Sequence, residues 1–294
     1  MTHLSDQIPL MQNIVFFKAT LLFYFLGTSF FLLNLWSRKG ERPPKPPPYG
    51  NEESVSTFRS PWSQKLAVAV TGAGFVFHTL ALIARIREAG YIPFTNLHEA
   101  ISFFSWAIVL AFFIVEFRYR LDILGSFILP LAFLSLVSAT ALPNEPHNLD
   151  PTLNNVLLGV HTTLSVLGIG AFALAFIAGI MYLLQERFLK SKQFNPLYYK
   201  LPSLDLLDEW NKKTILLGFP LLTLGIISGA LWAEYSFGSF WMSNNPKQAL
   251  SLGTWFFYLM VLHGRVTIGW RAKKAAHLAI IGFVGVIFIF VTLA

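Results

Sequence analysis

Long apolar runs, separated by short polar segments, follow one another along most of the chain. An α-helix rises 1.5 Å per residue, so about 20 apolar residues are needed to cross the hydrocarbon layer of a bilayer. The runs have about this length, and they predict an all-α, polytopic integral membrane protein with about eight transmembrane helices. We expect these helices at roughly 14–36, 66–86, 98–117, 121–141, 155–184, 214–234, 251–268 and 275–294.

Lysine and arginine residues gather in alternate loops between the apolar runs. Only a few of the 22 basic residues lie elsewhere, such as Arg85, Arg87 and Lys247 in the opposite loops. Loops rich in Lys and Arg stay on the cytoplasmic side of a membrane. We therefore expect the basic loops in the cytoplasm and both termini outside.

The composition is also that of a protein embedded in a lipid bilayer. Only 13% of the residues are charged, 54% are hydrophobic, and the mean hydropathy is +0.57. Soluble domains carry about 25% charged residues. The absence of cysteine excludes disulfides, CxxC redox chemistry and thiolate metal sites. The net charge of +7 follows from the basic loops and suits lipid headgroups, so it does not indicate a nucleic-acid partner.

The chain divides into three parts on this pattern. Residues 1–36 form a first transmembrane helix, which lacks the features of a cleaved signal peptide. Residues 37–65 form a cytoplasmic linker with the proline-rich stretch "ERPPKPPPYG", stiff and extended, with partner docking as an alternative role. Residues 66–294 form a seven-helix domain. Within it, residues 201–213 predict a short amphipathic helix on the inner membrane surface, capped by Ser203.

Histidines inside the apolar runs are the candidates for chemistry. The sequence has no HExxH, nucleophile elbow, Walker loop or dinucleotide fingerprint. An ionisable residue at membrane depth indicates function, although an interhelical hydrogen bond is the ordinary alternative for one histidine. The histidines in apolar runs are His78, His161, His263 and His277, while His98 and His147 lie in outward-facing loops.

The depths of three histidines suggest two levels of imidazole. At 1.5 Å per residue, His161 lies roughly 9 Å and His78 roughly 12 Å below the outer face, with His263 near or past the midplane. Because the spans hold almost no Asp or Glu, these imidazoles suit axial ligation of haem iron better than a proton relay or zinc hydrolysis. We predict haem b as the cofactor.

Aromatic residues are dense around the outward loop before the seventh run. Tryptophan and tyrosine at helix ends form an ordinary interfacial belt, but this cluster is denser than a belt requires. A platform that packs against a porphyrin face and an ordinary interfacial turn are both consistent with the sequence. The cluster comprises Trp232, Phe237, Phe240, Trp241 and Trp255.

Residues 229–270 resemble the tryptophan-rich segment of the cytochrome c assembly family, which includes CcsA-, CcmC- and HemX-like proteins. Two upstream segments, 90–106 and 161–186, also resemble this family, so the resemblance covers about residues 70–294. The matching residues of the tryptophan-rich segment are Gly238, Trp241, Pro246, Lys247, Trp255, Leu262, His263, Arg265, Gly269 and Trp270.

The resemblance implies roles for two of the histidines. His161 resembles an axial ligand of an outward-facing haem, and His263 resembles a ligand of haem deeper in the membrane. His78 has no counterpart and is a candidate from its depth alone. Of the aromatics, Trp232, Trp241 and Trp255 are candidate haem contacts.

The sequence departs from the family pattern in the same segment. Asn244 and Asn245 stand where a Trp-Asp pair is expected and Gln248 replaces a Glu, which keeps hydrogen bonding but removes charge. One extra residue also separates Trp241 from Pro246. The CcsA pattern places a further histidine in an outward segment after the last helices. We expect that ligand to come from His98, His147 or a partner.

Two functions are consistent with this resemblance. The first is a haem-binding protein of cytochrome c biogenesis in the bacterial cytoplasmic (inner) membrane. It would handle or deliver haem across or at the outer face for attachment to apocytochrome c, beside a CcsB/ResB-like membrane protein. It would be a carrier or a component of a haem lyase system, not a self-contained enzyme. The alternative is a HemX-like regulator of tetrapyrrole (haem) biosynthesis that acts on a cytoplasmic enzyme.

The sequence agrees less well with a third class of function, a transporter or an electron-transfer cytochrome. Transporters often show paired broken helices or inverted repeats, and we find neither in the sequence. An electron-transfer subunit would place paired histidines on facing helices at both depths.

Overall fold

The computed structural model describes residues 2–37, 62–89, 96–119, 123–143, 155–193, 195–241 and 246–292. The described residues are almost entirely helical and contain no strand, which confirms the all-α prediction. The helices are α1 (Thr2–Ser37), α2 (Trp62–Ala89), α3 (Leu97–Tyr119), α4 (Gly125–Thr140), α5 (Val156–Lys190), α6 (Pro196–Lys200), α7 (Leu204–Phe237), α8 (Pro246–His263), the π-helix η2 (Gly264–Ile268) and α9 (Ala272–Thr292).

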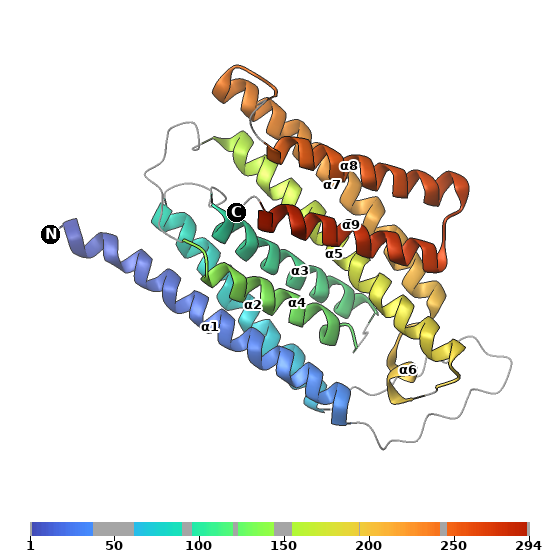
Figure 1. The fold of residues 1–294 in the computed structure, drawn as a ribbon. Coiled ribbons are helices and arrows are strands. Elements are labelled where there is room, and N and C mark those ends of the chain that lie inside the picture. The colour runs from blue at the N-terminus through green and yellow to red at the C-terminus, as the bar shows by residue number, and fades with distance from the viewer. Residues whose placement is uncertain are drawn as a thin grey trace.

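The long helices lie side by side in one bundle (Figure 1). Helix α5 is central and contacts α3, α7 and α9. Helix α1 packs along α2 and α4, so the first predicted part of the chain belongs to the same bundle as the rest. Helix α8 packs on α7 and α9 at the other side. The predicted linker at 37–65 lies largely outside the described residues.

Among the residues that the structure describes, five helices are long and apolar enough to cross a membrane: Gln12–Leu35, Trp62–Ala89, Leu97–Phe117, Val156–Lys190 and Leu204–Phe237. They support a multi-pass membrane protein. Helix α4 is apolar but has only 16 residues, and α8 and α9 fall on the predicted seventh and eighth runs. Many apolar side chains on the bundle surface are exposed, as lipid-facing positions are.

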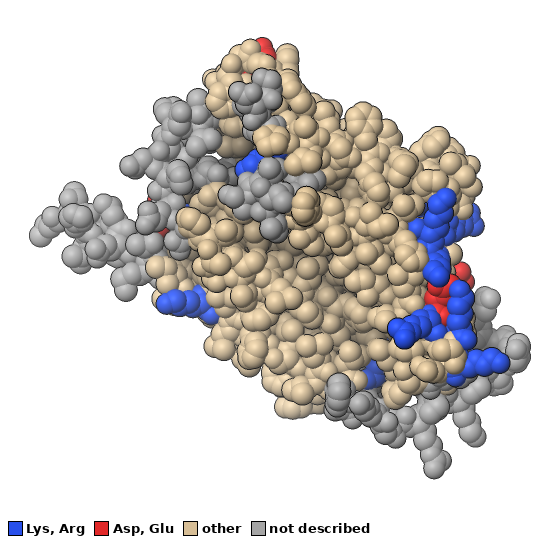
Figure 2. Space-filling view, in the orientation of Figure 1, with Lys and Arg blue, Asp and Glu red and all other residues tan. Residues whose placement is uncertain are grey.

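The bundle has one basic end, where α5 ends and where α7 and α9 begin. Figure 2 shows Lys and Arg side chains gathered at that end, with a wide uncharged surface between it and the other end. We call these the basic end and the opposite end. Arg187, Lys190, Lys212, Lys213, Lys273 and Lys274 lie at the basic end.

The predicted surface helix at 201–213 is not a separate element, and that prediction is wrong. Ser203 caps a helix as expected, with its side chain accepting from the Leu206 amide at 3.3 Å, but that helix is all of α7. Leu207, Asn211 and Ile215 are buried at a spacing of four residues. These three residues continue the buried face of the membrane-spanning part of α7. The first turns of α7 therefore belong to the same helix as the predicted sixth run.

Small residues bring α5 and α7 into close contact. A Cβ atom on Gly168 would lie 3.0 Å from the Leu222 amide nitrogen and 3.1 Å from the Gly218 carbonyl oxygen. Both are backbone atoms of α7, so they have little freedom to move aside. Close backbone approach through small residues is a common way to pack helices in membranes.

We expect Gly168→Ala to destabilise the bundle by about 1–3 kcal/mol, because the new methyl group pushes α7 away from α5. Gly170→Ala is the matched control, since its Cβ would meet Ile108 Cγ2 at an ordinary 3.7 Å. Unfolding in mixed detergent micelles measures both variants. Equal stabilities for the two would contradict a close α5–α7 contact.

Candidate functional site

His161 has the geometry of an oriented metal ligand. Asn155 caps α5 by accepting from the Leu157 amide at 2.8 Å, and His161 follows about one and a half turns later, at the opposite end. Its Nδ1 lies 2.7 Å from the carbonyl oxygen of Gly225 on α7. A carbonyl oxygen can only accept, so Nδ1 carries the proton and the lone pair is on Nε2.

The remaining nitrogen of His161 is open for coordination. The side chain is half-buried, and the described part of the chain provides no hydrogen-bond partner for Nε2. Metal-ligating histidines commonly donate their other N–H to a carbonyl, which fixes the ring orientation. Gly229 gives the ring its space, since a Cβ there would lie 2.5 Å from Nδ1. These contacts suit the predicted ligand role.

His78 is engaged through both ring nitrogens. Its Nδ1 lies 3.1 Å from the hydroxyl of Tyr24 on α1, and its Nε2 lies 3.1 Å from the hydroxyl of Ser102 on α3. The side chain is fully buried. This is the interhelical hydrogen bonding that we gave as the ordinary alternative, and it leaves neither nitrogen free for iron. The structure therefore gives no support to the ligand role predicted for His78 from depth.

His263 lies at the surface of the bundle. It is the last residue of α8, and its side chain is exposed, so it does not face the interior of the bundle. The reason is two residues away, where Arg265 is buried. Residues two apart on a helix point to nearly opposite sides. The inward direction of Arg265 thus turns His263 away from the bundle interior and away from α5.

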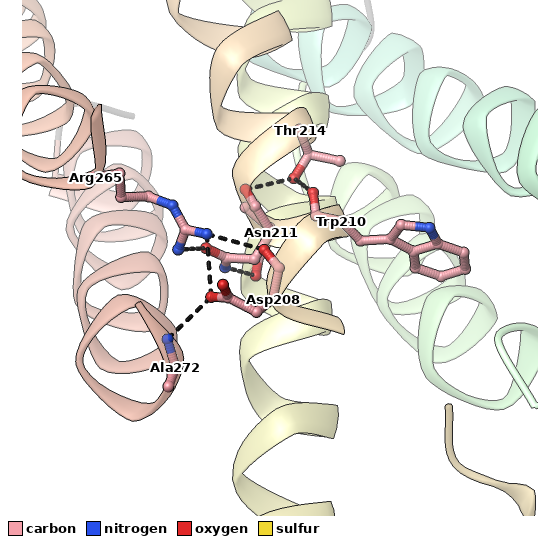
Figure 3. Close-up of polar contacts among 7 residues, drawn as sticks. Asp208, Trp210, Asn211, Thr214, Arg265 and Ala272 are labelled. Carbon is pink, nitrogen blue, oxygen red and sulfur yellow. Dashed lines mark hydrogen bonds and ion pairs between the residues drawn. The ribbon is translucent and has the colours of Figure 1, made fainter. Parts of the chain in front are cut away.

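Arg265 is the centre of a polar junction at the basic end (Figure 3). Its Nη2 contacts Asp208 Oδ1 at 3.0 Å and donates to the Asp208 carbonyl at 2.9 Å, and its Nη1 donates to Asn211 Oδ1 at 2.9 Å. Asn211 in turn donates to the Ala175 carbonyl of α5 at 2.9 Å. Asp208 Oδ1 also accepts from the amide of Ala272, the first residue of α9. The junction joins α5, α7, η2 and α9.

The candidate aromatic residues that the structure describes do not form a single platform. Trp255 packs between α7 and α8, with its indole nitrogen donating to Thr223 at 2.9 Å. Trp232 is half-buried and meets Phe237 edge-on, with 5.5 Å between ring centroids. Trp241 is 48% exposed after the end of α7. Residues 242–245, with Asn244 and Asn245, lie outside the described residues.

An ion-pair cluster at the opposite end was missed from the sequence. Arg85 on α2 binds Glu99 on α3 at 2.9 Å and Glu88 at 3.3 Å, and all three side chains are almost fully buried. Asn96 accepts from the Glu99 amide at 2.8 Å and so caps α3. Asn96 and Glu99 belong to the segment 90–106, which resembles the family. Only the resemblance pointed to them, because Arg85 was assigned to a loop.

His98 lies beside this cluster. Its Nδ1 donates to the Ala139 carbonyl of α4 at 2.8 Å, and its ring packs on Phe17 of α1 with 5.3 Å between centroids. Like His161, it therefore keeps its lone pair on Nε2. His147 lies outside the described residues.

The structure defines a multi-pass helical membrane protein with an oriented histidine near one end of the bundle and a second histidine on its lateral surface. The sequence profile described as Cytochrome C assembly protein matches residues 94–293. The chain belongs to the cytochrome c assembly protein family.

Several similar proteins carry the name cytochrome c biogenesis protein CcsA. That of Guillardia theta is 32% identical over 225 residues, which cover 70% of this chain and 74% of the relative. That of Prochlorococcus marinus (strain AS9601) is 32% identical over 232 residues, covering 71% and 75%. That of Chlamydomonas reinhardtii is 33% identical over 224 residues, covering 74% and 62%.

These relatives bear on two further predictions. They support a role in cytochrome c biogenesis and give no support to the HemX-like alternative. They come from algae as well as bacteria, so they do not confirm that the membrane is a bacterial cytoplasmic membrane.

Proposed function

We propose that the protein handles haem for attachment to apocytochrome c, with His161 as an axial ligand at the opposite end of the bundle. The observation that carries the proposal is the hydrogen bond from Nδ1 to the Gly225 carbonyl, which leaves Nε2 free on a fixed ring. A bound haem would supply the iron that Nε2 coordinates. The chain's own part is to hold the imidazole in one tautomer and one orientation.

His263 is the second proposed ligand, and its exposure suggests where its haem would lie. A haem on His263 would sit on the outer surface of α8 and not between α8 and α5. A second ligand would then come from a neighbouring membrane protein, for which a CcsB/ResB-like protein is our candidate. The chain would thus be one component of a haem lyase system, with apocytochrome c as the acceptor. The bacterial cytoplasmic membrane stays our predicted location.

The visible spectrum of the purified protein in detergent tests this proposal. We expect the reduced protein, purified together with a CcsB/ResB-like partner, to show sharp bis-imidazole haem bands, weakened in both His161→Ala and His263→Ala. His78→Gln is the control, because His78 has no free nitrogen in the structure. It is expected to lower stability and leave the bands of the folded fraction unchanged. A protein that stays colourless with added haem, alone and with a CcsB/ResB-like partner, would contradict the proposal.

A further inference from the structure

A groove opens between α5 and α9 at the basic end. The two helices touch at Gly179, whose Cβ would lie 2.9 Å from the Ala276 carbonyl oxygen. Beyond this contact they leave a shallow space of about 560 Å³ that is open to the surroundings. Leu183, Glu186, Arg187 and Lys190 of α5 and Lys273 and His277 of α9 line it.

The groove has an excess of positive charge. Its one carboxylate, Glu186, is already bound to Lys190 at 2.6 Å. Arg187 and Lys273 are exposed and form no ion pair with any residue that the structure describes. The neighbouring Lys274 is turned elsewhere, with its ammonium 3.7 Å from the centre of the Trp270 ring. Two cations are therefore available in the groove for an external anion.

An apolar surface continues from these cations along one face of α9. Lys273, His277, Ile281, Val284 and Phe288 follow at helical spacings of three and four residues, and all five side chains are exposed. The face is thus basic in its first two turns and apolar in the next three. This order matches an anionic amphiphile whose head lies at the basic end and whose chains run toward the opposite end.

We propose that the α5–α9 groove binds a phospholipid with an anionic headgroup. The phosphate would lie between Arg187 and Lys273, and an acyl chain would run along Ile281, Val284 and Phe288. Basic pockets between transmembrane helices are known to hold anionic headgroups. The proposal differs from a general attraction of the basic end to lipid, because it requires the two helices that form the groove.

Native mass spectrometry of the delipidated full chain tests this proposal. Phosphatidylglycerol is the probe, and phosphatidylcholine with the same acyl chains is the neutral-headgroup comparison. Each cation near an anionic lipid contributes substantially to binding, so we expect Arg187→Gln with Lys273→Gln to weaken phosphatidylglycerol binding about tenfold or more. The charge-retaining pair Arg187→Lys with Lys273→Arg is expected to keep most of the affinity.

The matched control is Lys212→Gln with Lys213→Gln, which removes the same charge from the same end but outside the groove. We expect its affinity to be nearly unchanged. Equal losses in the two glutamine pairs, or equal binding of the neutral lipid, would overturn the proposal. Displacement of the lipid by millimolar glycerol 3-phosphate would assign the groove to a soluble phosphate and overturn the lipid assignment. Circular dichroism verifies that each variant is folded.

Discussion

Asp208→Ala is expected to lower the free energy of unfolding by about 3 kcal/mol, measured in mixed detergent micelles. The side chain of Arg265 is only 1% exposed, so the substitution leaves a guanidinium buried without its carboxylate. Removing one partner of a buried ion pair costs about 3–5 kcal/mol. We expect the lower value, because the Asn211 side chain and the Asp208 carbonyl still accept from Arg265.

Glu209→Ala is the control for this measurement. Glu209 is the next residue of α7 and pairs with Lys213 at 2.7 Å, but both side chains are more than half exposed. Exposed pairs contribute about 0–1 kcal/mol, so we expect little change. If Asp208→Ala were as mild as Glu209→Ala, Arg265 would not depend on the junction for its burial.

Gly229→Ala is expected to weaken haem retention about 10–100-fold, the usual effect of disturbing a group that orients a metal ligand. The new Cβ would lie 2.5 Å from His161 Nδ1, so the imidazole has to turn away and lose its bond to Gly225. Haem titration of the purified variant, followed in the visible spectrum, measures the effect. This prediction rests on His161 as a haem ligand.

Gly253→Ala is the corresponding control, because a Cβ at that position of α8 meets nothing within 4 Å. It is expected to bind haem like the unsubstituted protein. If Gly229→Ala kept full affinity while His161→Ala lost it, the present orientation of the ring would not be needed for binding.

Much of the fold follows from the sequence because apolar length and periodicity are local properties. The predicted run at 66–86 lies within α2, and that at 121–141 encloses α4. The predicted start of the seventh run was wrong because a local sequence signal was overlooked. Helix α8 begins at Pro246, five residues before the predicted start, and proline is a common first residue of a helix.

The site was less predictable because its contacts join residues far apart in the chain. The partners of His78 come from α1 and α3, and Arg265 meets Asp208 across 57 residues. The sequence pattern identified His161 as a candidate but could not show that Gly225 fixes its tautomer. The exposure of His263 likewise depends on the partners of Arg265 and not on the apolar run around it.

Helix α7 reaches from the junction around Arg265 to the surroundings of His161. This one helix, with Pro220 inside it, carries Asp208 and Asn211, which anchor the segment after His263, and also Gly225 and Gly229, which hold His161. Asn211 and Gly225 are 14 residues apart, or about 21 Å along the axis. A shift of α7 as a whole would displace the supports of both imidazoles. The two proposed ligands are therefore supported by one and the same helix.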